Sequence, residues 1–270
     1  SRIGPLSLLS SLSWAAMSRV APGEEGEGVT VELHKRETSG SGYWTHPGIC
    51  TVTFCEGDPK AAYQALRPRL RATIDANPWI AGQLVQGGGL PKRRLVHPTV
   101  GSDAIVDDIL SMVPSVAPIS RSSPYKQLVK ATGGSAQLTV QSGGKLAKSG
   151  ARITKLVVLE PPAAGGEFAL IFSMSHVVAD GHDYYRIFNM IAGNAPVEAM
   201  SAVRVAEYET REAEWTGKED FKWISGGAGL IKGMLGGLLF GPKSSWCSYY
   251  VDDAKVEAAK AAAKASKEVD

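Results

Sequence analysis

The chain has 270 residues, of which 44% are hydrophobic and 21% charged, and its formal net charge at pH 7 is only +2. This composition is typical of a globular protein with a substantial core, and the near balance of charge gives no electrostatic footprint for a nucleic-acid partner. No apolar run reaches the roughly 18 residues that a transmembrane helix needs. The three cysteines, Cys50, Cys55 and Cys247, fit neither a disulfide framework nor a zinc site. We therefore expect a reducing compartment, the cytoplasm, with an organelle as the alternative.

Four β-rich runs in the first 100 residues are predicted to form strands. They cover residues 29–34, 49–54, 79–85 and 93–97. The last two are separated by a Gly-rich turn and are expected to pair as a hairpin. Between the second and the third run, Asp58 and Pro59 are typical of a helix start, with Asp as the N-cap and Pro at the first helical position. This helix should end at Asn77, with a kink or break at Pro68.

Shorter elements are predicted in the middle of the chain. They are a helix over 104–112, a loop over 114–124, a strand over 136–141, a turn at 143–144, and two strong apolar strands over 153–159 and 168–174. Because turn residues separate the last two strands, we expect them to form an antiparallel pair. This pair would bring the end of the second strand, and the residues that follow it, to an edge of the sheet.

The C-terminal third is predicted to contain a charged helix over 203–215, a strand over 246–251 and an Ala/Lys-rich helix over 252–267. Residues 226–241 are Gly-rich and apolar, and they are too short to cross a membrane. Two interpretations stay open for them. They form part of a mobile insertion, residues 216–244, packed loosely on the core, or they are a flap that makes peripheral contact with a lipid surface or a partner.

Residues 167–192 combine an apolar strand, a polar turn and an amphipathic helix. The strand ends before Ser175 and His176, and the turn is expected at Asp180 and Gly181, because Asp bonds local backbone and Gly tolerates positive φ. The following helix carries an apolar stripe at helical spacing, made of Tyr184, Ile187, Phe188 and Ile191. A strand therefore delivers His176 to an edge, and a helix leaves from Asp180 and Gly181.

The spacing His176-x-x-x-Asp180-Gly181, between a strand and a helix, resembles the motif of the CoA-dependent acyltransferase superfamily. Its members include chloramphenicol acetyltransferase, the plant BAHD acyltransferases, wax ester synthases and peptide-synthetase condensation domains. The resemblance implies an α/β fold of the chloramphenicol acetyltransferase type, with a mixed, largely antiparallel sheet flanked by helices. Residues 1–270 would be the N-terminal acyltransferase-like domain, the first of two similar halves. The family's Asp-Phe-Gly-Trp-Gly-like motif belongs to the missing C-terminal half, so whether this half alone is active stays open.

The same resemblance implies a role for each motif residue. His176 would be the general base that takes a proton from an alcohol or amine acceptor while it attacks the thioester of acyl-CoA or of a carrier, within a ternary complex. Asp180 would be structural and paired with an arginine that holds the loop, and Gly181 would permit a tight turn and close approach of substrate. Acyl-CoA would be a co-substrate, with no resident cofactor and no metal. A single histidine, with Ser175 where other relatives carry a second one, is closer to the BAHD and chloramphenicol acetyltransferase branches.

Two alternatives to this enzyme interpretation were weighed. A metal site formed by His176, Asp180 and His182 has suitable ligand types, but its spacing matches no common metal motif. A non-catalytic acyl- or protein-binding module of the same fold would keep the strand-turn-helix pattern without transferring an acyl group. Neither Ser173 nor Ser175 lies in the Gly-x-Ser-x-Gly context of a serine hydrolase.

Overall fold

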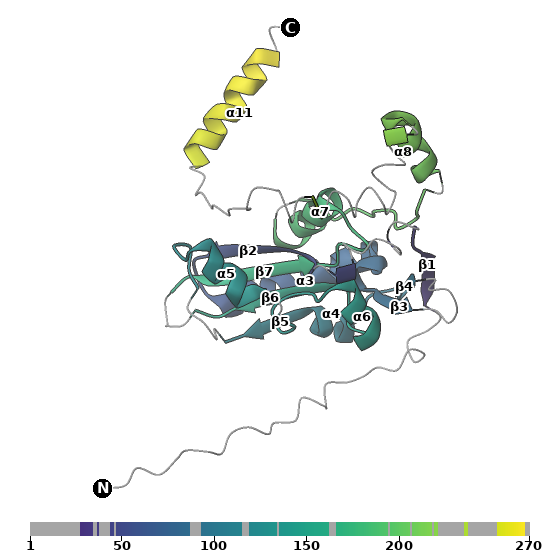
Figure 1. Ribbon diagram of the computed structural model, residues 1–270. Coiled ribbons are helices and arrows are strands. Elements are labelled where there is room, and N and C mark those ends of the chain that lie inside the picture. The colour runs from purple at the N-terminus through teal and green to yellow at the C-terminus, as the bar shows by residue number, and fades with distance from the viewer. Residues whose placement is uncertain are drawn as a thin grey trace. The chain divides into compact units, whose positions relative to one another are not determined.

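The computed structural model is shown in Figure 1, and it describes residues 28–34, 37, 44–45, 47–86, 93–114, 119–133, 135–161, 166–193, 195–205, 207–217, 219–220, 235–236 and 253–267. The chain divides into two compact units. The larger unit comprises Ser1–Ser120 and Thr132–Arg204, and the smaller comprises Arg121–Ala131 and Val205–Asp270. The strand over residues 168–174 and the helix that leaves from Asp180 and Gly181, called the motif strand and the motif helix below, both belong to the larger unit.

A four-stranded sheet forms the centre of the larger unit. Its strands, in spatial order, are β2 (Ile49–Cys55), β7 (Phe168–Met174), β6 (Thr154–Leu159) and β5 (Leu110–Val113). Strand β7 pairs antiparallel with β2 on one side and with β6 on the other, which confirms the predicted antiparallel pair, whereas β5 pairs parallel with β6. All seven residues of β7 are buried, which explains why its sequence is a continuous apolar run without alternation.

A second, three-stranded antiparallel sheet is formed by β1 (Val29–Glu32), β4 (Arg93–His97) and β3 (Gln83–Gln86), in that order. It confirms the predicted hairpin of the third and fourth β-rich runs. The prediction of a strand over residues 79–85 is only partly right. Its first residues form a short 3₁₀ helix, η2 (Pro78–Ala81), because Trp79, Ile80 and Ala81 are all buried in a tight turn that directly follows the end of the preceding helix.

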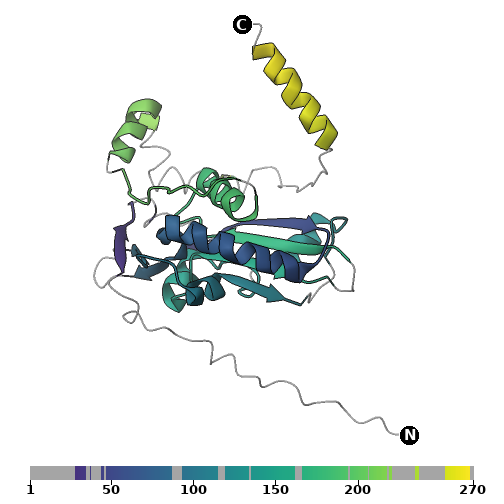
Figure 2. The ribbon, with the colours of Figure 1, turned by 180° about the vertical axis from the view of Figure 1, so that it is seen from behind.

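Helices α3 (Pro59–Ala76) and α7 (Gly181–Ala192) pack against each other and on one face of the central sheet, and Figure 2 shows α3 in front of the strands. Helix α3 begins as predicted, with the Asp58 side chain accepting a hydrogen bond from the Lys60 backbone N–H at 2.9 Å. The predicted break at Pro68 is wrong, since the helix continues through it. The buried stripe around it, which includes Leu70 and Ile74, offsets the lost backbone hydrogen bond by packing on the core.

The opposite face of the central sheet receives residues 135–140, which do not form the predicted strand. Two hydrogen bonds fix them there: the Val140 N–H donates to Ser173 Oγ at 2.9 Å, and Lys155 Nζ donates to the Ala136 carbonyl at 2.6 Å. The segment turns because the Ser135 carbonyl accepts from the backbone N–H groups of residues 138 and 139. Burial against this segment lowers the pKa of the Lys155 ammonium.

Three further helices differ from the sequence predictions. Residues 143–144, predicted as a turn, begin helix α6 (Gly143–Ser149), which ends at Gly150 in the left-handed conformation. The predicted helix over 104–112 is observed as α4 (Asp103–Ile109), and its last residues instead form β5. Helix α5 (Tyr125–Thr132) begins directly after the predicted loop and was not predicted.

The smaller unit contains α8 (Tyr208–Thr216) and α11 (Asp253–Lys267), close to the helices predicted over 203–215 and 252–267. The predicted strand over 246–251 and, apart from residues 235–236, the Gly-rich stretch over 226–241 lie outside the described residues. In the part of the chain that the structure describes, no helix combines the length and apolarity needed to cross a membrane. The predicted fold class, α/β with a mixed, largely antiparallel sheet flanked by helices, is confirmed.

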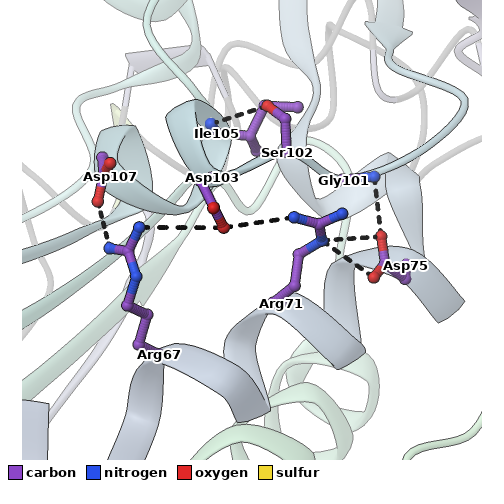
Figure 3. Close-up of polar contacts among 8 residues, drawn as sticks. All are labelled: Arg67, Arg71, Asp75, Gly101, Ser102, Asp103, Ile105 and Asp107. Carbon is purple, nitrogen blue, oxygen red and sulfur yellow. Dashed lines mark hydrogen bonds and ion pairs between the residues drawn. The ribbon is translucent and has the colours of Figure 1, made fainter. Parts of the chain in front are cut away.

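Charged side chains join α3 to α4 at the surface (Figure 3). Arg67 bonds Asp107, while Arg71 Nε lies 3.0 Å from the Asp75 carboxylate and Arg71 Nη1 lies 3.4 Å from Asp103. Asp75 also accepts the Gly101 N–H at 3.0 Å, so its carboxylate ties the start of the α4 segment to α3. These groups are exposed to solvent, so each pair contributes little alone, and the network orients α4 more than it stabilises the fold.

We expect Asp107→Asn to destabilise the protein slightly at pH 7 and less in acid. The hydrogen bond from Arg67 holds the pKa of Asp107 below its ordinary value, so this stabilisation is present above the unfolded-state pKa and is lost as pH falls through the folded-state pKa. Urea unfolding of both proteins at pH 7, and again near pH 3, measures the difference. Molar salt should shrink it at pH 7, and an equal difference at both pH values would contradict the assignment.

Candidate active site

His176 is the first side chain to leave the interior after the motif strand. Strand β7 ends at Met174, and Ser175 is still buried, with its N–H donating to the Ile153 carbonyl at 2.8 Å. Residues 176–178 then form a turn in which His176 is exposed while Val177 and Val178 are buried. The structure therefore places His176 at the end of the central sheet with its side chain at the surface of the larger unit, as the sequence predicts.

A hydrogen bond within this turn sets the protonation pattern of the ring. His176 Nδ1 lies 2.9 Å from the Ala179 carbonyl oxygen. Because a carbonyl oxygen only accepts hydrogen bonds, Nδ1 carries the proton, and the lone pair of the neutral ring is on Nε2. The same bond would stabilise the ring after Nε2 gains a proton, because Nδ1–H remains a donor in the imidazolium. In this tautomer, Nε2 is the ring nitrogen that can accept a proton.

Asp180 caps the motif helix. Its Oδ1 accepts the Asp183 N–H at 3.0 Å, and its backbone is extended, as an N-cap requires. The ion pair with an arginine that the resemblance implies for Asp180 does not occur among the described residues. Partial burial and the nearby Asp180 charge both raise the pKa of Asp183 above its ordinary value.

Gly181 and His182 open helix α7, and both are exposed. Gly181 does not adopt positive φ, and a Cβ built on it meets no atom within 4 Å. The expectation that Gly181 is needed for a tight turn is therefore wrong, although the open space above it is compatible with a close approach of substrate. Among the residues that the structure describes, His176, Asp180 and His182 do not form a cluster suited to a metal ion, and neither does any other group.

An arginine that the sequence analysis did not single out contacts the motif loop, residues 175–180. Arg204 donates from Nη2 to the Val178 carbonyl at 3.0 Å. Its guanidinium also pairs with Glu37, with Nη2 2.8 Å from Oε1 and Nε 3.1 Å from Oε2. Glu37 and Arg204 lie far apart in the sequence, and no local pattern marks either of them as functional. Only the folded chain shows that they meet.

Two glycines let the loop pack closely on its neighbours. A Cβ on Gly48, just before β2, would lie 2.2 Å from the Met174 carbonyl oxygen, and a Cβ on Gly143 would lie 2.7 Å from Val177 Cγ2. The Trp44 ring packs on the same side, with its Cε3 atom 3.2 Å from the Cβ position on Gly143. The turn that carries His176 is therefore enclosed by backbone and ring atoms that leave little room for it to shift.

Tyr184 fastens the first turn of α7 to two strands. Its hydroxyl donates to the Phe172 carbonyl at 2.7 Å and lies 2.9 Å from Thr51 Oγ1 on β2. The ring packs on Phe172, with centroids 4.9 Å apart, and burial raises the pKa of the phenol. The helix that follows the motif is thus held at a fixed position on the sheet, and with it the C-terminal end of the loop.

No family model and no curated protein matches the chain. Among solved structures, F. sporotrichioides TRI101 complexed with coenzyme A and T-2 is similar at 12% identity and a TM-score of 0.42, over 73% of this chain and 44% of that chain. Holo T3CT is similar at 16% identity and a TM-score of 0.45, over 72% and 40%. The complex of the X-domain and OxyB from teicoplanin biosynthesis matches at 16% identity and a TM-score of 0.42, over 86% and 47%.

The chain thus spans less than half the length of each of these three solved chains. At such identities and TM-scores, the likeness assigns neither a family nor an activity to this protein.

We expect Asp180→Ala to cost about 1 kcal/mol of unfolding free energy, because it removes the N-cap of α7, whereas Asp180→Asn should cost only a few tenths of that, since Asn caps as well as Asp. Chemical denaturation of the three proteins at one pH measures both changes. If Asn were as damaging as Ala, the carboxylate charge would matter more than the cap.

We expect Gly48→Ala to destabilise the protein by roughly 1–3 kcal/mol, because the new methyl group overlaps the backbone of Met174 and something must move. The matched control is Gly144→Ala, where the nearest atom to an added Cβ is the Trp44 carbonyl oxygen at 3.4 Å and the residue lies in helix α6. The control should be neutral or slightly stabilising. Equal unfolding midpoints for both variants would rule out close packing at Gly48.

Proposed function

We propose that this protein is an acyltransferase that moves an acyl group from acyl-CoA, or from a carrier-bound thioester, to the hydroxyl or amine of a small acceptor. The observation that carries the proposal is the exposed His176 at the end of the central strand, with Nδ1 bonded to the Ala179 carbonyl. The resemblance of the motif to the CoA-dependent acyltransferase superfamily supplies the substrate class.

His176 Nε2 would take the proton of the acceptor as the acceptor oxygen or nitrogen attacks the thioester carbonyl. The tetrahedral intermediate then collapses, the carbon–sulfur bond breaks, and the thiolate leaves and regains a proton from the imidazolium. The Ala179 carbonyl stabilises the imidazolium, since it accepts a hydrogen bond from Nδ1–H in both states of the ring. This chemistry requires neither a resident cofactor nor a nucleophilic serine, and Ser175 is buried beneath the turn.

Asp180 supports this site indirectly in the proposal. It starts α7 immediately after the turn, and the helix is fastened to the sheet by Tyr184. Gly181 leaves the space beside the helix start open for substrate. Because the chain spans less than half of each of the three solved structures named above, the identity of donor and acceptor, and the activity of the protein as a whole, belong to the proposal.

The decisive experiment follows the release of free thiol from a panel of acyl-CoA esters with DTNB, with and without alcohol and amine acceptors, using the full-length protein. We expect acceptor-dependent release, and we expect His176→Gln to slow it by about 10²–10⁴-fold, the usual contribution of a general base. His182→Gln is the matched control, because His182 is an exposed histidine of the same segment, and it should leave the rate nearly unchanged.

Unchanged turnover in His176→Gln would refute the role of His176. Binding of acyl-CoA by the wild-type protein without any acceptor-dependent thiol release would favour the non-catalytic acyl-binding module instead. Circular dichroism of each variant separates loss of chemistry from loss of fold.

A further inference from the structure

We propose that Glu37 and Arg204 form an ion pair that positions the His176 ring. The pair acts on the ring through the peptide unit that joins Val178 to Ala179. The consequence for catalysis rests on the function proposed above, in which His176 is the base. The geometric claim, that this pair fixes the orientation and tautomer of the ring, can be tested without any acyl transfer.

The first step is the contact of Arg204 with the loop. Its Nη2 donates to the Val178 carbonyl at 3.0 Å, and this carbonyl shares a peptide plane with the Ala179 nitrogen. A charged donor holds a carbonyl more strongly than a neutral one does. The guanidinium thus restrains the rotation of the whole peptide unit between Val178 and Ala179.

The second step leads from that peptide to the imidazole. The Ala179 carbonyl, one peptide further along, accepts the hydrogen bond from His176 Nδ1 at 2.9 Å. If the peptide before Ala179 rotated, this carbonyl would turn with the backbone, and the bond that places the proton on Nδ1 would weaken. The ring would then lose both its preferred tautomer and its direction.

Glu37 fixes Arg204 from the other side. The carboxylate binds the guanidinium with both oxygens, at 2.8 and 3.1 Å, and its Oε2 also accepts the His34 N–H at 2.7 Å. The Glu37 backbone carbonyl accepts the indole N–H of Trp44, a residue that packs beside Val177. Glu37 therefore connects the segment around Trp44 to the arginine, and it forms the kind of ion pair that the resemblance implied for Asp180.

Burial makes this pair consequential. The side chains of Arg204 and Glu37 are only 18% and 20% exposed. Removing one partner leaves the other charge largely shielded from water and without its bidentate bond, which is costly for a mostly buried group. By contrast Arg186, on α7, pairs with Glu198 at 3.1 Å with side chains 42% and 60% exposed, and no hydrogen bond of its guanidinium to the motif loop is found among the described residues.

The experiment compares Glu37→Gln, Arg204→Lys and Arg204→Met with the control Arg186→Met, all in the full chain labelled with ¹⁵N-histidine. The ¹⁵N shifts of His176 report the tautomer and the pKa of the ring. We expect the wild type and Arg186→Met to show the proton on Nδ1. The Arg204 variants should shift toward a mixture of tautomers, and Glu37→Gln should shift in the same direction to a smaller extent. Arg204→Lys keeps the positive charge but lacks the planar guanidinium that binds Glu37 through two nitrogens, so it should not restore the wild-type signature.

Kinetics supply the second measurement once turnover is established. Outer-shell partners that orient metal ligands typically contribute 10–100-fold. By analogy we expect kcat to fall about 10–100-fold in Arg204→Met with KM little changed, as for an interaction felt mainly in the transition state. Arg186→Met should retain both constants.

Folded Arg204 and Glu37 variants with the wild-type ¹⁵N signature would overturn the inference, whether or not the protein transfers acyl groups. Should Arg204→Met fail to fold, Glu37→Gln, which keeps shape and removes only charge, decides the matter. If the signatures change as expected but no acyl transfer is ever detected, the positioning claim stands and the proposed function fails.

Discussion

The burial of β7 along its whole length is the constraint on which the candidate site depends. Its neighbours β2 and β6 hydrogen-bond it on both edges, α3 and α7 cover one face, and residues 135–140 lie against the other. A strand enclosed in this way can present chemistry only where it ends. The chain leaves the sheet after Met174, Ser175 is still inside, and His176 is the first exposed side chain. The position of the imidazole is therefore a consequence of how the core is built around one strand.

The turn that follows is restrained from several independent directions. Gly48 and Gly143 allow backbone and side chains to approach it closely, Tyr184 holds the start of α7 on the sheet, and Arg204 binds a carbonyl within it. Proteins commonly place reactive groups on loops, and a loop orients such a group only if the scaffold fixes it. Here the scaffold supplies hydrogen bonds to the backbone of the loop, so several of the side chains that fix its geometry lie behind His176 and not beside its ring.

The sequence predicts those parts of this arrangement whose causes are local. The apolar run of β7, the stripe of α7 and the Asp58 cap each follow from periodicity or capping chemistry, whereas the role expected for His176 comes from the resemblance of its motif. The errors arise where tertiary packing decides. Pro68 is accommodated within α3 because the buried stripe on either side holds the helix, and residues 136–140 have a strand-like pattern but follow the surface of the sheet. Glu37 and Arg204 could not be found, since each is an ordinary charged residue until folding brings them together.

Arg204 is also the last residue of the larger unit, and Val205 begins the smaller one. The residue whose side chain binds the motif loop is thus the one at which the chain passes from the larger unit into the smaller. A change at this boundary that displaced Arg204 would remove a charged donor from the loop, while the close packing at Gly48 and Gly143 and the Tyr184 hydrogen bonds would stay in place.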